Sequence, residues 1–258
     1  KLFELCLLDK INQHIEKYDI LHQNQKGFRE GKSTRHNIVE VLKLVAGARE
    51  KEQWYRSNKI PNAARNKQWL CFADLKSAFD KPIRTRIIQM LYDYKFPNDL
   101  IRIIKELMTD TSVDVNGVNV TTQLGTAQGS TISPILFSLL MNPIVTELNE
   151  ITGGRCYCYA DDIAIWATSY EILVKAIKAL KRWCSMNRIE INFNKSGVLC
   201  CRKDKRTPPP WEKTVENFPV VTHYKYLGII IDDSNKLDIH LDLKKEKEQE
   251  LLKNKWLF

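Results

Sequence analysis

The sequence contains no run of eighteen apolar residues, and its amino terminus shows no signal-peptide pattern. It therefore predicts no membrane-spanning segment and no membrane partner. The seven cysteines form no CxxC pair, which argues against zinc ribbons and thiol redox motifs. Because the cysteines are odd in number and lie largely in apolar segments, we expect buried thiols in a reducing, intracellular compartment.

Basic residues outnumber acidic ones. Lysine and arginine total 40 against 31 aspartates and glutamates, which gives a formal net charge of +9. This surplus predicts a polyanionic partner, nucleic acid before a membrane surface. The chain has 258 residues, 43% of them hydrophobic, enough for one domain or two abutting lobes. It starts inside a helical pattern and stops on apolar residues, so we expect a fragment of a longer polypeptide.

Helical and strand patterns alternate without internal repeats, which predicts an α+β fold. A helix is expected from about Thr34, and the apolar run WLCFADL (69–75) predicts a central buried strand. Valines alternate about an Asn-Gly pair in residues 113–120, which predicts a β-hairpin. The threonine and glutamate of residues 168–171 predict a capping box, and residues 224–231 predict one short strand.

The stretch CYCYADDIAIWA (156–167) places two adjacent carboxylates between two alternating apolar segments. This period of two predicts two strands that meet in a tight hairpin at Asp161-Asp162. The pair is either an ordinary polar turn or a cation site. Asp74, at the end of a second predicted buried strand, favours the cation site, because buried carboxylates need compensating partners. Three acids at neighbouring strand ends would suit Mg²⁺, and two such ions serve in-line phosphoryl displacement.

Two glycine-containing stretches have simpler interpretations. GTAQGSTISPILF (125–137) reads as a loop and helix start, or as a close backbone approach to a ligand. GKST (31–34) is not a phosphate-binding P-loop, because only three residues separate Gly27 from Gly31 and no strand precedes them.

Taken together, FADLKSAFD, AQGSTISPILF, YADD, NFNKSG and YLGIIID resemble the palm motifs of reverse transcriptases in order and rough separation. QKGFREGKST, ahead of them, resembles the fingers segment of the same family. Within the family the chain looks most like the non-LTR (LINE-type) retrotransposon enzymes. Thr126-Ala127 departs from the bulkier valine pair that is frequent there, and Lys76-Ser77 occupies a variable position.

This resemblance implies a right-hand polymerase palm with partial fingers and the start of a thumb. The fingers part would cover residues 1–68, the palm 69–232 with a fingers insertion around 81–124, and the thumb 233–258. The implied activity is RNA-directed DNA polymerase in retrotransposition, with an RNA template, a DNA primer and dNTPs as partners, acting in the nucleus. We expect the isolated 258 residues to be a weak or inactive enzyme.

The resemblance also implies the catalytic residues. Asp74 and Asp161 would be the main ligands of two Mg²⁺ ions, with Asp162 secondary, and Mn²⁺ can substitute. Neighbouring strand residues point to opposite faces, which agrees with unequal roles for the adjacent pair. Lys195 would assist departure of pyrophosphate as a proton donor, or would be an ordinary solvated turn lysine.

The implied nucleotide-binding residues are Phe79, Gln128, Gly129, Arg29 and Lys32. Phe79 would lie beneath the sugar and exclude a ribose 2′-hydroxyl, unless it is a core residue. Gln128 and Gly129 would line the nucleotide and template pocket. Arg29 and Lys32 are the nearest basic candidates for the triphosphate, or serve the template strand.

Tyr226, Leu227 and Gly228 would form the primer grip, although YLGIIID also reads as a plain core strand. Two alternatives remain open: a group II intron-type reverse transcriptase, and a domesticated, non-catalytic RNA-binding scaffold. The presence of all three acids favours catalysis over the scaffold.

Overall fold

The computed structural model describes residues 1–60, 68–76, 84–109, 112–115, 118–121, 130–201 and 213–232. Its helices are α1 (Leu2–Lys17), α2 (Thr34–Ser57), α3 (Arg84–Asp93), α4 (Asn98–Thr109), α5 (Ser133–Thr152), α6 (Tyr170–Met186) and the short 3-10 helix η2 (Phe193–Lys195). Its strands are β1 (Gln68–Ala73), β2 (Leu75–Lys76), β3 (Ser112–Val115), β4 (Val118–Thr121), β5 (Cys156–Tyr159), β6 (Asp162–Ala167), β7 (Glu190–Ile191), β8 (Gly197–Cys201), β9 (Thr214–Val215), β10 (Phe218–Val221), β11 (His223–Tyr226) and β12 (Ile229–Asp232). The predicted start of a thumb, 233–258, lies outside the described residues.

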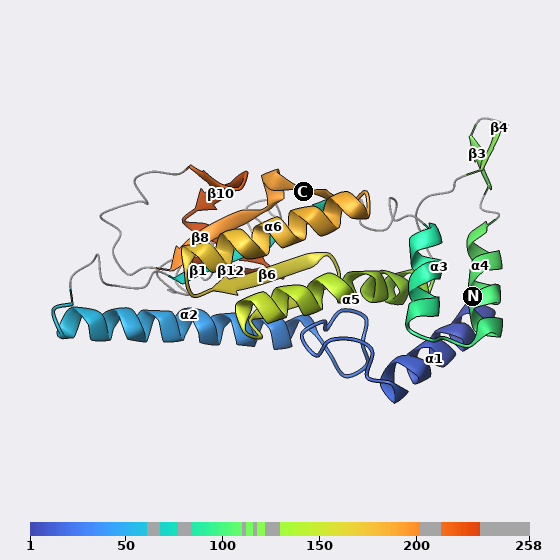
Figure 1. Cartoon of the computed structure of the whole chain (residues 1–258), viewed down its shortest axis with the longest axis horizontal. Coiled ribbons are helices and arrows are strands. Elements are labelled where there is room, and N and C mark those ends of the chain that lie inside the picture. Colours follow the sequence, from blue (N-terminus) through green and yellow to red (C-terminus); the bar gives the residue numbers. More distant parts are fainter. Residues whose placement is uncertain are drawn as a thin grey trace, which may run out of the picture.

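A six-stranded sheet in the order β5-β6-β1-β8-β10-β9 forms the centre of the molecule (Figure 1). β1 is antiparallel to both of its neighbours, β6 and β8, and β10 runs parallel to β8. β1 is buried along almost its whole length because both faces are covered, which explains its nearly continuous apolar sequence. The prediction of a central buried strand is therefore confirmed.

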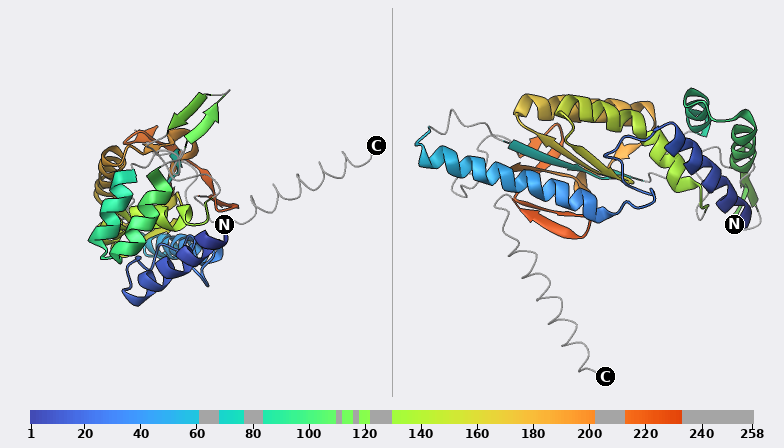
Figure 2. Two further views of the ribbon diagram at one scale, coloured as in Figure 1. Left: turned by 90° about the vertical axis from the view of Figure 1, so that its right-hand side faces the viewer. Right: turned by 90° about the horizontal axis from the view of Figure 1, so that it is seen from below.

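Side chains of β1 alternate between two separate apolar cores. Trp69 and Cys71 belong to the core that contains the buried faces of α5 and α6. Leu70 and Phe72 belong to a second core, which includes residues of α2 and of the β11–β12 hairpin. The right-hand view of Figure 2 shows strands of the sheet between α6 and α2. One face of the sheet, here called the helical face, is thus covered by α5 and α6. The opposite face is covered by α2 and the β11–β12 hairpin.

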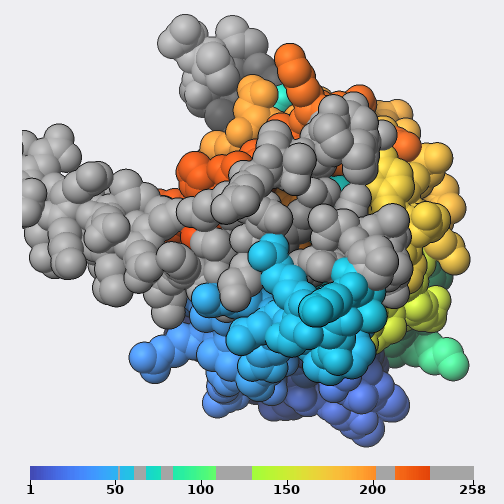
Figure 3. Space-filling view, turned by 90° about the vertical axis from the view of Figure 1, so that its left-hand side faces the viewer, coloured from blue at the N-terminus to red at the C-terminus, as the bar shows by residue number. Residues whose placement is uncertain are grey.

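Helices α1, α3 and α4 gather at one end of the molecule, next to the β3–β4 hairpin (Figure 1). In this hairpin Val113 pairs with Val120 and Val115 with Val118, which confirms the predicted pairing; its Asn-Gly turn lies outside the described residues. At the other end, the C-terminal part of α2 lies at the surface (Figure 3). Among the residues that the structure describes, no helix is long and apolar enough to cross a membrane.

Three local predictions are wrong. Ser169, not Thr168, caps α6, and its side chain accepts a hydrogen bond from the Ile172 amide at 3.3 Å. Residues 224–231 are not one strand, because Leu227 (φ 45°) and Gly228 (φ 89°) reverse the chain between β11 and β12. Cys6 is exposed on α1 rather than buried, unlike the cysteines of β1 and β5.

A buried asparagine joins α5 to the start of β5. The Asn149 side-chain oxygen accepts hydrogen bonds from the Cys156 amide at 3.1 Å and from Asn24 Nδ2 at 2.8 Å. Its amide nitrogen donates to the Cys156 carbonyl at 3.0 Å. Asn149 therefore satisfies both backbone groups of Cys156 and holds the loop of Asn24 beside the same strand.

We predict that Asn149→Ala lowers the free energy of unfolding by about 3 kcal/mol, because buried donors and acceptors would lose their partners. Urea unfolding of the 258-residue chain measures this loss. Asn194→Ala, at an exposed position, is the matched control and should change stability by less than about 0.5 kcal/mol. Equal stabilities of the two variants would contradict the assigned role of Asn149.

Candidate active site

The carboxylate turn (residues 159–162) lies at the end of three neighbouring strands. Tyr159, the last residue of β5, pairs with Asp162, the first residue of β6. Asp74 directly follows β1, whose last residue, Ala73, pairs with Ile163. Continuing this register by one residue sets Asp74 beside Asp162. The predicted hairpin at the acidic pair is confirmed, and all three acids lie at one end of the sheet.

Burial and mutual repulsion shift the acidity of these groups. Burial raises the pKa of Asp162 to about 6, with further contributions from the negative charges of Asp161 and Asp74. Burial is also the main cause that raises the pKa of Asp161, and Asp74 adds to it. The Lys195 ammonium opposes both pKa shifts. The three carboxylates therefore share one region of negative potential that Lys195 only partly offsets.

The acids have the chemistry to bind a divalent cation whose other ligands are water or phosphate oxygens. Within the described ranges, no three or more His, Cys, Asp or Glu side chains are grouped closely enough to hold a metal ion by themselves. Mg²⁺ is commonly held by one or two carboxylates together with water and substrate phosphates, so a complete protein cage is not required. The repulsion that raises the pKa of Asp162 is the repulsion that a divalent cation would relieve.

The η2 turn (residues 192–196) packs directly against Asp74. The Asn192 side-chain amide donates to Asp74 Oδ2 at 3.0 Å, and the Asn192 backbone amide donates to the Asp74 carbonyl at 2.8 Å. Ser196 Oγ accepts from the Asp74 amide at 3.1 Å. Lys195, in the same turn, is exposed, and its positive charge lowers the pKa of Asp161 and of Asp162. Its role as a proton donor stays a prediction.

Tyr224, which no sequence motif singled out, lies beside the acids. Its ring stacks on Phe72 at a centroid distance of 4.3 Å and an interplanar angle of 5°. Its hydroxyl donates to the Lys195 carbonyl at 2.5 Å. Burial and the charges of Asp162 and Asp74 raise its pKa, which keeps the hydroxyl protonated as a donor. Tyr224 thus ties the β11–β12 hairpin to the η2 turn.

The fingers loop (residues 21–33) closes the outer edge of β5. The Cys158 amide donates to the Asn24 carbonyl at 2.9 Å, and the Lys26 amide donates to the Cys158 carbonyl at 3.0 Å. Gln25 and Cys158 form a parallel bridge between these bonds. The segment that resembles the fingers motif is therefore hydrogen-bonded to the strand that leads into the carboxylate turn.

Gly27 of this loop lies against the backbone of the carboxylate turn. A Cβ at Gly27 would lie 2.4 Å from the Ala160 nitrogen, closer than real Cβ atoms approach. Ala160 itself has φ 55°, in the left-handed region that non-glycine residues seldom adopt. The contact between the two residues fixes a strained turn, a feature that clusters at functional sites.

The Arg29 side chain is held within the fingers loop, and its predicted nucleotide contact stays a prediction. Its side chain is only 11% exposed; it pairs with Glu16 at 3.3 Å and donates to three backbone carbonyls of the fingers loop at 3.4–3.5 Å. These contacts use the guanidinium to hold the loop itself. Lys32 is exposed. Burial is the main cause that lowers the pKa of Lys26, and the positive charge of Lys32 lowers it further. Lys26, whose Nζ lies 5.6 Å from the centre of the Tyr157 ring, is a basic residue that the motif analysis missed.

The remaining predicted residues are placed unequally. Phe79, Gln128 and Gly129 lie outside the described residues. Tyr226 is only 1% exposed, so its side chain is part of the core, whereas Leu227 and Gly228 form the turn of the β11–β12 hairpin. Their role as a primer grip stays a prediction, and it would fall to the turn rather than to the Tyr226 ring.

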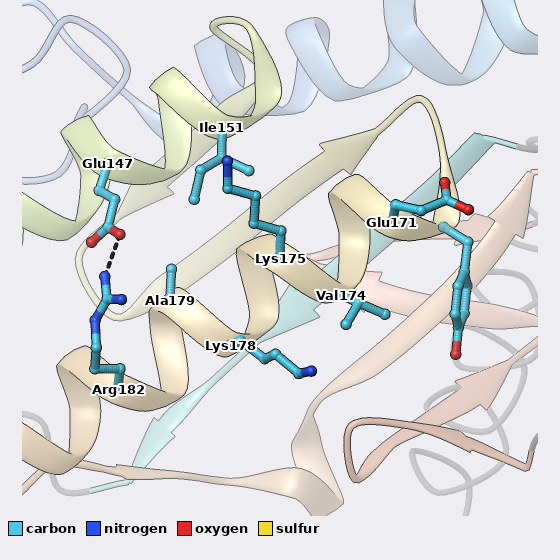
Figure 4. Close-up of a pocket in the computed structure, with 9 residues that line it drawn as sticks. Glu147, Ile151, Glu171, Val174, Lys175, Lys178, Ala179 and Arg182 are labelled. Carbon is cyan, nitrogen blue, oxygen red and sulfur yellow. Dashed lines mark hydrogen bonds and ion pairs between the residues drawn. The ribbon is translucent and has the colours of Figure 1, made fainter.

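A groove of about 700 Å³ lies elsewhere, along α5 and α6 (Figure 4). Ile151 and Val174 contribute apolar lining, and Glu147 pairs with Arg182 across it. None of the three predicted acids lines this groove. It is therefore separate from the candidate active site.

We predict that Gly27→Ala lowers the free energy of unfolding by about 1–3 kcal/mol, because the added Cβ collides with backbone that cannot shift cheaply. Gly47→Ala is the matched control, since nothing lies within 4 Å of a Cβ at that helical position. It should raise stability by up to about 1 kcal/mol. Urea unfolding of both variants measures the difference, and equal effects would refute the proposed contact.

Asp162 should make the metal-free protein less stable as pH rises. Its folded pKa of about 6 exceeds the ordinary value of 3.8, so the folded state binds the proton more tightly. This contribution is present at low pH and is lost as pH rises from about 4 through about 6. Asp162→Asn should remove it, so that the variant gains stability relative to wild type with rising pH.

Urea unfolding in EDTA at about pH 4 and about pH 8 tests this sign. Asp99→Asn is the control, because the Asp99 side chain is 89% exposed on α4. An identical pH dependence in wild type and Asp162→Asn would contradict the expected shift.

Comparison with known proteins identifies the family of the chain. The family "Reverse transcriptase (RNA-dependent DNA polymerase)" matches residues 3–231. The chain is similar to the probable RNA-directed DNA polymerase from transposon X-element of Drosophila melanogaster (22% identity) and to the polymerase from mobile element jockey of Drosophila funebris (25%). Both matches cover 100% of this chain and 28% of the relative, so the chain spans little more than a quarter of their length.

Solved telomerase structures share the fold. Telomerase of Candida tropicalis, truncated from its C-terminal domain, matches with a TM-score of 0.55 at 12% identity, over 90% of this chain and 43% of that one. A complex of Candida tropicalis telomerase with a TWJ fragment of telomeric RNA matches with a TM-score of 0.58 at 11% identity, over 90% of this chain and 36% of that one. These matches agree with the predicted α+β palm and partial fingers. With the family match over nearly the whole chain, they lead to one conclusion: the chain belongs to the reverse transcriptase family, and its curated relatives are LINE-type retrotransposon polymerases.

Proposed function

We propose that the protein is an RNA-directed DNA polymerase that copies an RNA template into DNA during retrotransposition. The observation that carries this proposal is the group of three acids at one end of the sheet, in a chain of the reverse transcriptase family. Because the chain spans 28% of its relatives, the activity is assigned to the full-length protein. The substrates are an RNA template, a DNA primer and dNTPs, and the proposed compartment is the nucleus.

In this proposal Asp74, Asp161 and Asp162 hold divalent cations, two Mg²⁺ or Mn²⁺. When bound, these ions would offset the charge on the attacking 3′-hydroxyl and on the leaving pyrophosphate. The exposed Lys195 ammonium, close enough to affect both acids of the carboxylate turn, donates a proton to the departing pyrophosphate oxygen. The exposed Lys32 attracts the nucleic-acid backbone or the triphosphate.

We predict that Asp161→Asn in the full-length protein lowers the rate of primer extension at least about 100-fold, because one ligand charge is lost at nearly constant side-chain volume. Extension of oligo(dT) on poly(rA) with dTTP and Mg²⁺ measures the rate. Asp99→Asn should extend at the wild-type rate, since that carboxylate is exposed on α4.

Each result of this assay is decisive. Wild-type activity in Asp161→Asn would refute the assignment of the acids. Binding of the RNA–DNA hybrid without any extension by the wild-type protein would favour the non-catalytic scaffold. A group II intron-type enzyme would catalyse the same reaction. It would differ in the RNA that copurifies with it.

Phe79 is proposed to select deoxynucleotides by occupying the space of a ribose 2′-hydroxyl. We predict that Phe79→Val raises the incorporation of UTP relative to dTTP by at least about tenfold, because a ring-sized space opens beneath the sugar. Competition assays with the two nucleotides measure this ratio. An unchanged ratio in a fully active variant would show that the ring serves the core instead.

A further inference from the structure

Asn192 makes a contact with Asp74 that strand pairing alone does not require. β2 and β7 pair in antiparallel register, Leu75 with Ile191 and Lys76 with Glu190. The backbone bond from the Asn192 amide to the Asp74 carbonyl, at 2.8 Å, extends this pairing by one residue. The side-chain bond from Asn192 Nδ2 to Asp74 Oδ2, at 3.0 Å, comes in addition. It acts on the carboxylate and not on the backbone.

The rest of the η2 turn keeps this amide in place. Ser196 is buried, and its Oγ donates to the Asn192 carbonyl at 2.8 Å while accepting from the Asp74 amide at 3.1 Å. Tyr224 fixes the following part of the turn through the Lys195 carbonyl. Asn192 and Asp74 are both only partly buried, so water could satisfy either side chain, and burial does not explain their direct contact.

The chemistry of the contact suits a cation ligand. An amide restrains a carboxylate without adding positive charge, whereas a lysine or arginine at the same place would offset the charge that attracts a cation. The bond commits Oδ2 to the amide and leaves Oδ1 to the ion. Hydrogen bonds of this kind orient ligands, and their removal typically weakens metal affinity or activity by 10–100-fold.

We propose that Asn192 is a positioning residue that orients the Asp74 carboxylate toward a divalent cation. This inference rests on the proposed function of the site. It adds a residue that acts through Asp74 and does not itself touch the substrate.

The test compares Asn192→Ala with Asn194→Ala in the full-length protein. Asn194 lies in the same η2 turn and is exposed, so the two substitutions match in chemistry and location. Two quantities are measured: the affinity for Mn²⁺, from electron paramagnetic resonance without substrate, and the Mg²⁺ concentration that gives half-maximal primer extension. Asn192→Ala should weaken both by about 10–100-fold, with a melting temperature close to wild type. Asn194→Ala should match wild type in both.

Asn192→Ser is made in parallel, because it also removes the amide and keeps a polar side chain at a partly exposed position. If the melting temperature of Asn192→Ala falls well below that of wild type, the Mn²⁺ affinity and Mg²⁺ dependence of the serine variant are used instead. Unchanged Mn²⁺ affinity and Mg²⁺ dependence in a folded Asn192 variant of an extending enzyme would overturn the inference alone. An equal loss in Asn194→Ala would also overturn it, since the effect would belong to the turn in general.

The Mn²⁺ measurement separates this inference from the proposed function. A wild-type protein that binds Mn²⁺ but never extends a primer would overturn the polymerase assignment, and a weaker affinity in the Asn192 variants would still support the positioning role. A wild-type protein that neither binds Mn²⁺ nor extends would overturn both.

Discussion

Negative charge gathered at half-buried strand ends is the constraint on which the rest of this structure depends. Asp161 and Asp162 stay in an arrangement that raises the pKa of both only because rigid neighbours hold the backbone. Ala160 accepts a left-handed conformation, and Gly27 packs against it without a side chain. In the proposed function the site holds a cation and a polyphosphate, so it has to retain this unfavourable charge beforehand, and the two apolar cores supply the stability that offsets it.

The two faces of the sheet differ in the residues that they present. On the helical face, residues such as Cys71 and Ile165 form a continuous core with α5 and α6. On the opposite face the apolar residues give way to polar groups at the strand ends, where Phe72 is followed two residues later by Asp74. The Tyr224 ring lies over this transition, stacked on Phe72 and bonded to the η2 turn. The apolar core and the Asp74 carboxylate therefore lie next to each other on one face of the sheet, at the end of β1.

Sequence reasoning succeeded where the signal was local and periodic. Alternation around the acidic pair predicted the β5–β6 hairpin, and the apolar run of β1 predicted a strand covered on both faces. It did not reveal the side-chain contacts that Arg29 and Asn192 make in the folded chain. The Arg29 guanidinium donates to three backbone carbonyls of the fingers loop, and no local sequence pattern reveals these bonds. The hydrogen bond from Asn192 to Asp74 was likewise hidden, because the two residues lie 118 positions apart in the chain.

The bridge between Gln25 and Cys158 joins the fingers loop to the edge strand β5. Two residues beyond this bridge, Gly27 rests on the backbone of Ala160. Close-packed contacts transmit displacement instead of absorbing it. A displacement of the fingers loop would therefore be transmitted through Gly27 and Ala160 to the acids of the carboxylate turn.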